Sequence, residues 1–104
     1  MISVVIKFPI PKEITPEAYK DRIKDTISRY QKISGLIRKN YIFDEKSRVG
    51  GGIYNFASLE DAKACFDEEW QKRVETNFGK PEITYFDNLI EIDNVLNTVK
   101  VSDE

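Results

Sequence analysis

The side chains that most often carry out chemistry in proteins are scarce in this chain. Its 104 residues contain no histidine and a single cysteine, Cys65. Without histidine, zinc and haem sites lose their usual ligand, and nucleophilic triads lose their usual base. A lone cysteine also excludes an internal disulfide bond. Since no histidine is present to activate its thiol, we interpret Cys65 as a small packing residue of a helix.

Carboxylates remain as ligands for a hard cation such as Mg²⁺ or Ca²⁺. The acidic stretches at 44–46 and 67–69 lack the alternating oxygen ligands of a calcium-binding loop. We interpret the first as a solvated turn and the second as a solvated helix face. The sequence therefore predicts no metal site.

Three consecutive glycines at 50–52 resemble part of a phosphate-binding loop, in which backbone N–H groups bind an anion. Such loops lie between a strand and a helix and carry a lysine or a further glycine at fixed spacing. Here the glycines run directly into a predicted strand, so we predict no phosphate site. Glycine within a strand marks either a bulge or a place where a ligand or another backbone comes close, and both interpretations stay open.

The overall composition is that of a globular domain, with 40% hydrophobic and 33% charged residues. The net charge is -2 and no long block has one sign, which disfavours a nucleic-acid partner. No apolar run approaches the roughly 18 residues of a membrane span, and Met1 leads directly into a strand rather than into a signal sequence. We expect one cytoplasmic domain with no membrane partner.

Hydrophobic periodicity predicts four strands and two helices. The strands are expected at 2–8, 36–44, 49–57 and 83–92. The helices are expected over 15–34 and 58–78. Thr15 and Ser58 are the predicted N-caps, and Gly35 is the predicted glycine at the end of the first helix.

The resulting order β-α-β-β-α-β predicts an α+β, ferredoxin-like fold: a four-stranded antiparallel sheet with both helices on one face. We expect this domain to cover 1–93 and to be followed by a polar C-terminal tail at 94–104, whose role is open. The strand at 36–44 carries large apolar residues on both faces, with Ile42 on one and Tyr41 and Phe43 on the other. Because monomers seldom expose such patches, we expect a homodimer.

Three stretches, in this order and spacing, resemble the dimeric α+β barrel superfamily, and within it the YdhR-like monooxygenases. They are Gly35-Leu36-Ile37, Gly51-Gly52-Ile53-Tyr54-Asn55-Phe56 and Tyr85-Phe86-Asp87. The resemblance covers 2–92. It implies a dimer whose two sheets close into a barrel, with a pocket in each subunit between sheet and helices. It also implies oxidation of a quinol-like or anthrone-like aromatic compound by molecular oxygen with no cofactor.

Cofactor-free oxygenation needs a base that turns the substrate into an anion and a dry pocket that holds this anion. On the resemblance, Asp87 is the candidate base, and Trp70 and Asn55 complete the predicted catalytic set. The residues predicted to bind a small aromatic ligand are Arg38, Tyr41, Tyr54, Tyr85 and Phe86. Haem cleavage, which other relatives catalyse, is disfavoured because the chain has no histidine ligand.

Each of these residues also has an ordinary structural interpretation. Tyr54 is placed to pack in the core, and Trp70 continues the apolar stripe of the second predicted helix. Arg38 is as well placed to pair with an acid across a dimer, and Asp87 to hydrogen-bond a neighbouring strand. Two functions therefore stay open: a cofactor-independent monooxygenase, and a non-catalytic dimeric protein that binds a small molecule in the same pocket.

Overall fold

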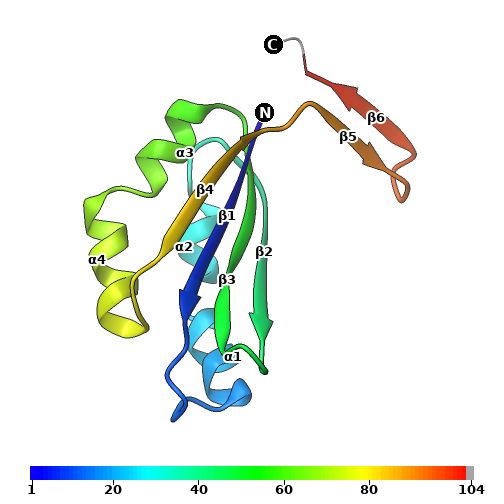
Figure 1. The fold of residues 1–104 in the computed structure, drawn as a ribbon. Helices are drawn as coiled ribbons and strands as arrows, with labels where there is room; N and C mark the ends of the chain where they lie inside the picture. The colour runs from blue at the N-terminus through cyan, green and yellow to red at the C-terminus, as the bar shows by residue number, and fades with distance from the viewer. Residues whose placement is uncertain (103–104) are drawn as a thin grey trace.

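The computed structural model describes residues 1–102 and shows an α+β fold (Figure 1). The strands are β1 (Ile2–Pro9), β2 (Leu36–Asp44), β3 (Val49–Phe56), β4 (Glu82–Asp87), β5 (Ile90–Asp93) and β6 (Thr98–Val101). The helices are α1 (Pro16–Lys24), α2 (Ile27–Gln31), α3 (Leu59–Cys65) and α4 (Glu68–Asn77). No helix within residues 1–102 is long and apolar enough to cross a membrane.

The main sheet has four strands in the order β2-β3-β1-β4, and all neighbours are antiparallel. All four helices lie on the same side of this sheet (Figure 1). The core fills the space between the two layers, where alternate residues of β1, from Ile2 to Phe8, are buried. The predicted ferredoxin-like fold is therefore confirmed.

Each predicted helix is divided into two shorter ones. The first divides after Lys24, where the Thr26 hydroxyl donates a 2.6 Å hydrogen bond to the carbonyl of Ile23 and competes with the helical pattern. The second restarts at Asp67, whose side chain accepts a 2.8 Å hydrogen bond from the amide of Trp70 and caps α4. The apolar stripe continues across both breaks, which is why its period alone predicted single helices.

The predicted helix starts are confirmed, whereas the first predicted helix, expected to end at 34, ends at Gln31 with Lys32 as its C-cap. The hydroxyls of Thr15 and Ser58 accept hydrogen bonds from amides three residues later, each at 3.1 Å. Gly35 has a φ of +78°, a conformation in which glycine carries no steric penalty. It turns the chain from α2 into β2.

Two of the three glycines of β3, Gly50 and Gly52, make room for tyrosine side chains. The register between β1 and β3 continues through them without a shift, so they form no bulge, and the one irregularity lies on β2 near Leu36. A Cβ atom at Gly50 would lie 2.5 Å from the Tyr19 hydroxyl, and one at Gly52 would lie 2.8 Å from the Tyr54 ring. The missing side chains thus let two rings lie flat against the sheet.

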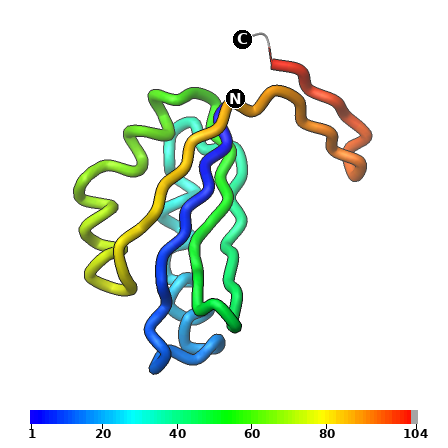
Figure 2. The backbone as a smooth tube through the Cα atoms, viewed as in Figure 1, coloured from blue at the N-terminus to red at the C-terminus, as the bar shows by residue number. Residues whose placement is uncertain are grey.

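The C-terminal part differs from the prediction. The fourth strand, predicted over 83–92, is interrupted after Asp87, and β5 pairs with β6 in a separate two-stranded sheet. This hairpin projects away from the body of the molecule (Figure 2). The stretch predicted as a polar tail thus contains a strand, and its last residues, 103–104, lie outside the described part of the chain.

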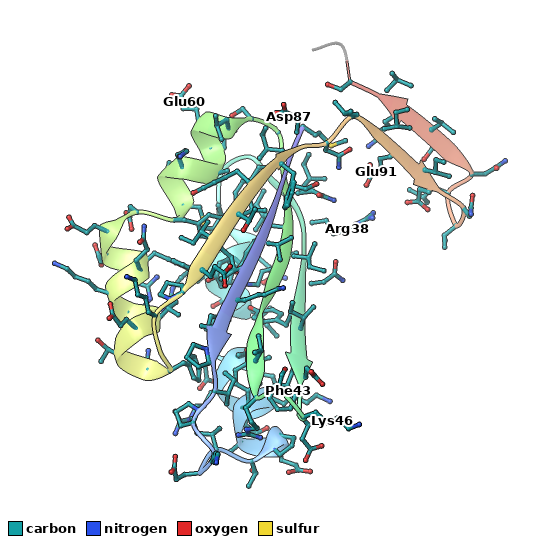
Figure 3. The ribbon with its side chains drawn as sticks, in the orientation of Figure 1. Arg38, Phe43, Lys46, Glu60, Asp87 and Glu91 are labelled. Atoms are coloured by element: carbon teal, nitrogen blue, oxygen red, sulfur yellow. The ribbon has the colours of Figure 1, made fainter. Side chains whose placement is uncertain are left out.

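One side chain of the body holds the hairpin by ion pairs. Arg38, on the sheet face opposite the helices, lies 3.7 Å from a carboxylate oxygen of Glu91 and 3.6 Å from one of Asp93 (Figure 3). The apolar cross-strand pairs Ile90–Val101 and Ile92–Val99 alternate with these acids along the hairpin. The hairpin therefore turns its acidic face toward Arg38 and its apolar face away from it.

Candidate functional site

An aromatic cage surrounds the side-chain amine of Lys39 on the helix-facing side of the sheet. Its Nζ lies 3.5 Å from the ring centroid of Tyr30, 4.1 Å from that of Tyr41 and 4.2 Å from that of Tyr54. The amine also donates a 2.5 Å hydrogen bond to the Tyr54 hydroxyl. Ring faces attract cations, so the cage binds the ammonium form and holds the amine in one place.

The sheet register and two hydrogen bonds position this cage. Lys39 lies directly opposite Tyr54 in the β2–β3 pairing, and Tyr41 follows two residues later on the same face. Tyr30 comes from α2, where its hydroxyl accepts a 2.8 Å hydrogen bond from Trp70 Nε1 of α4. The Tyr41 hydroxyl shares a 2.5 Å hydrogen bond with that of Thr26, at the break between α1 and α2. All three rings are therefore fixed by bonds or packing from other elements.

Burial makes the amine a group that titrates near neutrality. Burial lowers the pKa of Lys39 from 10.5 to about 7. Burial acts in the opposite direction on its acidic neighbours: it raises the pKa of Tyr54, and it raises that of the Cys65 thiol to about 11. A substantial fraction of Lys39 is therefore a neutral amine at neutral pH, while both neighbours stay protonated.

A small cavity of about 80 Å³ opens beside this cage. Its walls come from α1, α2 and α4 on one side and from the sheet on the other, and Trp70, which is 4% exposed, forms part of them. Its charged lining residues are Arg29, Lys39 and Arg73, and none of the described lining residues is acidic. The cavity is therefore positively charged although the chain as a whole has a net charge of -2.

One polar group at the cavity has no partner. The Tyr19 hydroxyl is buried and makes no hydrogen bond within the described residues. The nearby Gly51 amide does not reach it in hydrogen-bonding geometry but is close enough to oppose the effect of burial, which raises the pKa of Tyr19 to about 12. A buried hydroxyl without a partner costs free energy. Its oxygen has almost no accessible surface, so a bound molecule reaches it only if the cavity wall moves.

Two larger grooves adjoin the cavity. One, of about 530 Å³, runs between α1 and β2 and shares Tyr19, Ile23 and Tyr41 with the cavity. The other, of about 460 Å³, shares Tyr30, Lys39 and Tyr41. Because Tyr41 lines all three spaces, a ligand larger than the cavity can extend past this ring.

The structure brings three of the predicted site residues to this cavity: Trp70, Tyr41 and Tyr54. Tyr85 lies elsewhere in the same layer, with the amine of Lys63 4.4 Å from its ring centroid. Asp87, the predicted base, lies at the exposed end of β4, opposite Ile2 (Figure 3). Neither Tyr85 nor Asp87 lines the cavity.

The other three predicted residues lie on the opposite face of the sheet. Asn55 accepts a 2.7 Å hydrogen bond from the Ser3 hydroxyl, Arg38 pairs with the hairpin acids, and Phe86 is 52% exposed. Successive residues of a strand point to opposite faces, so neighbours such as Tyr54 and Asn55 cannot both reach one cavity. Asn55 and Phe86 are therefore separated from Lys39 by the sheet itself, whereas Arg38, on the edge strand β2, also lines the 460 Å³ groove that adjoins the cavity.

Lys39 was missed as a functional residue, although a signal for it was present. In the alternation of β2 it shares a face with Tyr41 and Phe43, both of which pack against the helices. A lysine on the apolar side of a strand is unusual, because lysine is seldom buried without a partner. The alternation thus indicated a buried amine.

Comparisons with known proteins agree on the fold. No protein-family model matches the chain, and no curated protein matches it significantly. The crystal structure of a protein from Bordetella bronchiseptica, described as a "putative antibiotic biosynthesis monooxygenase", matches with a TM-score of 0.64 at 10% sequence identity. The match covers 85% of this chain and 96% of that chain. At this identity the similarity shows a shared α+β fold alone.

Proposed function

We propose that this protein is a cofactor-independent monooxygenase that oxidises a small aromatic, quinol-like compound with molecular oxygen. The observation that carries the proposal is the aromatic-walled cavity beside the Lys39 amine. Oxygen reacts with electron-rich aromatic anions, so the protein needs to supply a base, a dry pocket and fixed positive charge. The similarly folded protein described as a monooxygenase adds support at the level of the fold.

The residues of the cavity have separable roles in this reaction. Lys39 is the group that titrates near neutrality, and it replaces Asp87 as our candidate base because Asp87 does not line the cavity. Trp70 acts through Tyr30, whose ring it orients by the hydrogen bond from Nε1. It is therefore a positioning residue as well as part of the wall.

The cavity volume narrows the substrate class. An engineered protein cavity of about 150 Å³ binds benzene, whereas this cavity measures about 80 Å³. One ring fits beside Lys39 only if the walls move apart to nearly double this volume, and further rings have to extend past Tyr41 into a groove. The geometry therefore favours a single-ring quinol over a tricyclic anthrone.

Oxygen uptake tests this function. We expect the purified, metal-stripped protein to accelerate oxygen uptake by at least one member of a panel of quinols and catechols. Lys39→Met should lower the rate about a hundredfold, since general bases contribute effects of that order, and Trp70→Phe about tenfold. Asp87→Asn, which changes an exposed carboxylate outside the cavity, is the matched control and should leave the rate unchanged.

Two outcomes would contradict the proposal in different ways. An absence of uptake across the panel, with ligand binding still measurable, would indicate the non-catalytic binding protein instead. Uptake that is lost in Asp87→Asn and kept in Lys39→Met would place the reaction at another site.

We also propose that two copies of the chain form a homodimer through the open sheet face and the hairpin. Ile53 and Phe86 are exposed on that face, and Ile90, Ile92 and Val99 are exposed on the hairpin. A two-stranded hairpin with an uncovered apolar face is marginally stable alone. Because its acidic face already contacts Arg38, the apolar face is left for a second copy.

The dimer is tested by measuring mass in solution. At micromolar concentration we expect twice the mass of the chain. Replacing Ile90 and Ile92 together with aspartate should yield monomers, since it places charge in the proposed apolar contact. Leu59→Asp, which alters an exposed apolar residue on the helical layer, is the control and should leave the dimer intact. A monomeric wild-type protein would disprove the proposal.

A further inference from the structure

We infer that the Lys39 amine also acts as a nucleophile and forms an imine with a small 2-oxo acid. This activity goes beyond the proposed oxidation, because it needs neither oxygen nor an aromatic ring. The lone pair of Nζ forms a C–N bond to the carbonyl carbon. The carbonyl oxygen takes up the two protons that the nitrogen loses and leaves as water. Nothing is oxidised or reduced in this step.

The amine of Lys39 has no carboxylate partner. Within residues 1–102 the ion pairs join Lys24 to Asp21 and Arg38 to the hairpin acids, and none involves Lys39. Lysine is seldom buried without a partner. A lysine that is desolvated beside aromatic rings and other cations is suited to act as a nucleophile. The pKa of Lys39, lowered to about 7, agrees with this arrangement.

The aromatic cage suits the product as well as the reactant. A protonated imine carries its positive charge at the same nitrogen, which lies 3.5 to 4.2 Å from the ring centroids of Tyr30, Tyr41 and Tyr54. The attraction between a cation and these ring faces is therefore kept after the reaction. The Tyr54 hydroxyl, 2.5 Å from Nζ, is close enough to exchange protons with this nitrogen.

The cavity volume favours a short carbonyl compound. The cavity measures about 80 Å³, roughly half of the volume that binds benzene in an engineered protein. Glyoxylate, the shortest 2-oxo acid, has no ring and is smaller than benzene. It therefore needs less movement of the walls than an aromatic ligand does.

Two arginines can bind the carboxylate of such a compound. Arg29 of α2 and Arg73 of α4 line the cavity on its helical side, whereas Lys39 lines it on the sheet side. Neither arginine forms an ion pair within residues 1–102. Guanidinium groups bind carboxylates through charge-assisted hydrogen bonds. In a 2-oxo acid the carbonyl carbon is bonded directly to the carboxylate, which matches an amine and two guanidinium groups around one small cavity.

Reductive trapping tests the inference. The protein is incubated under nitrogen at pH 7 with glyoxylate and sodium cyanoborohydride, which reduces an imine to a stable secondary amine. Mass spectrometry of peptides then measures the labelling of each lysine. Lys39 should be labelled at least about tenfold faster than the other lysines on average, because a desolvated amine beside a bound acid is more reactive than solvated ammonium groups. Lys39→Met should abolish this fast labelling.

Comparing glyoxylate with propanal, a neutral aldehyde, tests the role of the arginines. Arg73→Met should lower the labelling of Lys39 by glyoxylate about tenfold, as expected when a charge-assisted hydrogen bond is lost. It should leave the labelling by propanal unchanged, which would also show that the variant is folded. Arg22→Met is the matched control, because Arg22 is an exposed residue of α1 that does not line the cavity. It should behave like the wild type with both aldehydes.

Three results would overturn the inference: equal labelling of all lysines in the wild type, fast labelling that persists in Lys39→Met, or glyoxylate labelling of Lys39 that Arg73→Met leaves unchanged. Since the trapping is done without oxygen, its result is independent of oxygen uptake. A protein that traps glyoxylate but consumes no oxygen would retain this inference and lose the proposed function, and the reverse result would retain the proposed function alone.

Discussion

Replacing Lys39 with methionine is expected to raise the free energy of unfolding at pH 7 by about 2 kcal/mol. The pKa of this lysine is 10.5 in the unfolded chain and about 7 in the fold. A shift of that size lowers the free energy of unfolding by about 4 to 5 kcal/mol. Attraction between the ammonium group and the three ring faces offsets part of this loss. Methionine fills a similar volume without a charge and removes this cost.

The free energy of unfolding of the wild type should also change with pH in a direction that follows from the lowered pKa of Lys39. Between pH 7 and 10.5 the unfolded state binds a proton that the folded state does not, so wild-type stability should rise with pH across this window. The gain from Lys39→Met should therefore be largest at pH 7 and below, and should shrink toward about pH 10. Urea denaturation at several pH values measures both.

Lys63→Met is the matched control, because Lys63 also lies over a tyrosine ring but is exposed and outside the cavity. It should change stability by less than about 0.5 kcal/mol, as is usual for surface substitutions. If Lys39→Met destabilised the protein at pH 7, the attraction between the ammonium group and the rings would outweigh the cost of burying Lys39, and the prediction would be wrong. If Lys39→Met made the protein more stable but less active, this would show that Lys39 serves function at the expense of stability.

Gly51→Ala is expected to lower the free energy of unfolding by more than about 3 kcal/mol, enough to unfold many domains. Gly51 has a φ of +150°, which side-chain-bearing residues rarely adopt. A Cβ atom there would lie 1.9 Å from the carbonyl oxygen of Ile6 on the neighbouring strand. Since both groups belong to the backbone of paired strands, neither can move without breaking the pairing. Thermal melting followed by circular dichroism measures the loss.

Gly52→Ala is the matched comparison. Its φ is not positive, and the nearest atoms to a Cβ there would be in the ring of Tyr54, at 2.8 Å, with the backbone carbonyl oxygen of Asn40 farther away at 3.2 Å. The ring can shift by part of that overlap, so the loss of stability should be clearly smaller than for Gly51→Ala. Equal losses in the two variants would mean that crowding, and not backbone conformation, dominates in this strand.

The fold was predictable because its signals are local and repeated. Alternation located the four strands of the main sheet, and the caps at Thr15 and Ser58 located the helix starts. The breaks within the helices were not predictable from the period, because they depend on single bonds such as that of Thr26 to Ile23. The break after Asp87 was hidden for a similar reason: the apolar residues of β5 continue the pattern of β4 while pairing with β6.

Part of the lining of the candidate cavity could be predicted. Trp70, Tyr41 and Tyr54 line it, since each belongs to an apolar face that the sequence pattern directs into the layer between helices and sheet. Asn55 and Phe86 were selected with their strand neighbours as contiguous motifs, but a strand sends neighbours to opposite faces. Lys39 was missed although the alternation of β2 places it on the same face as Tyr41. The cage around its amine was not predictable, because it depends on tertiary packing that brings Tyr30 of α2 over the strand.

The hairpin of β5 and β6 has a consequence for the protein as it is synthesised. It follows the complete main sheet along the chain, and beyond the Arg38 ion pairs it is tied to the body mainly at its base, where the Asn88 amide donates a 2.9 Å hydrogen bond to the carbonyl of Met1. The main sheet can therefore form before a partner covers the hairpin. Until its apolar side is covered, both hairpin edges can pair with other nascent chains, so crowded expression at high temperature favours aggregates over assembled protein.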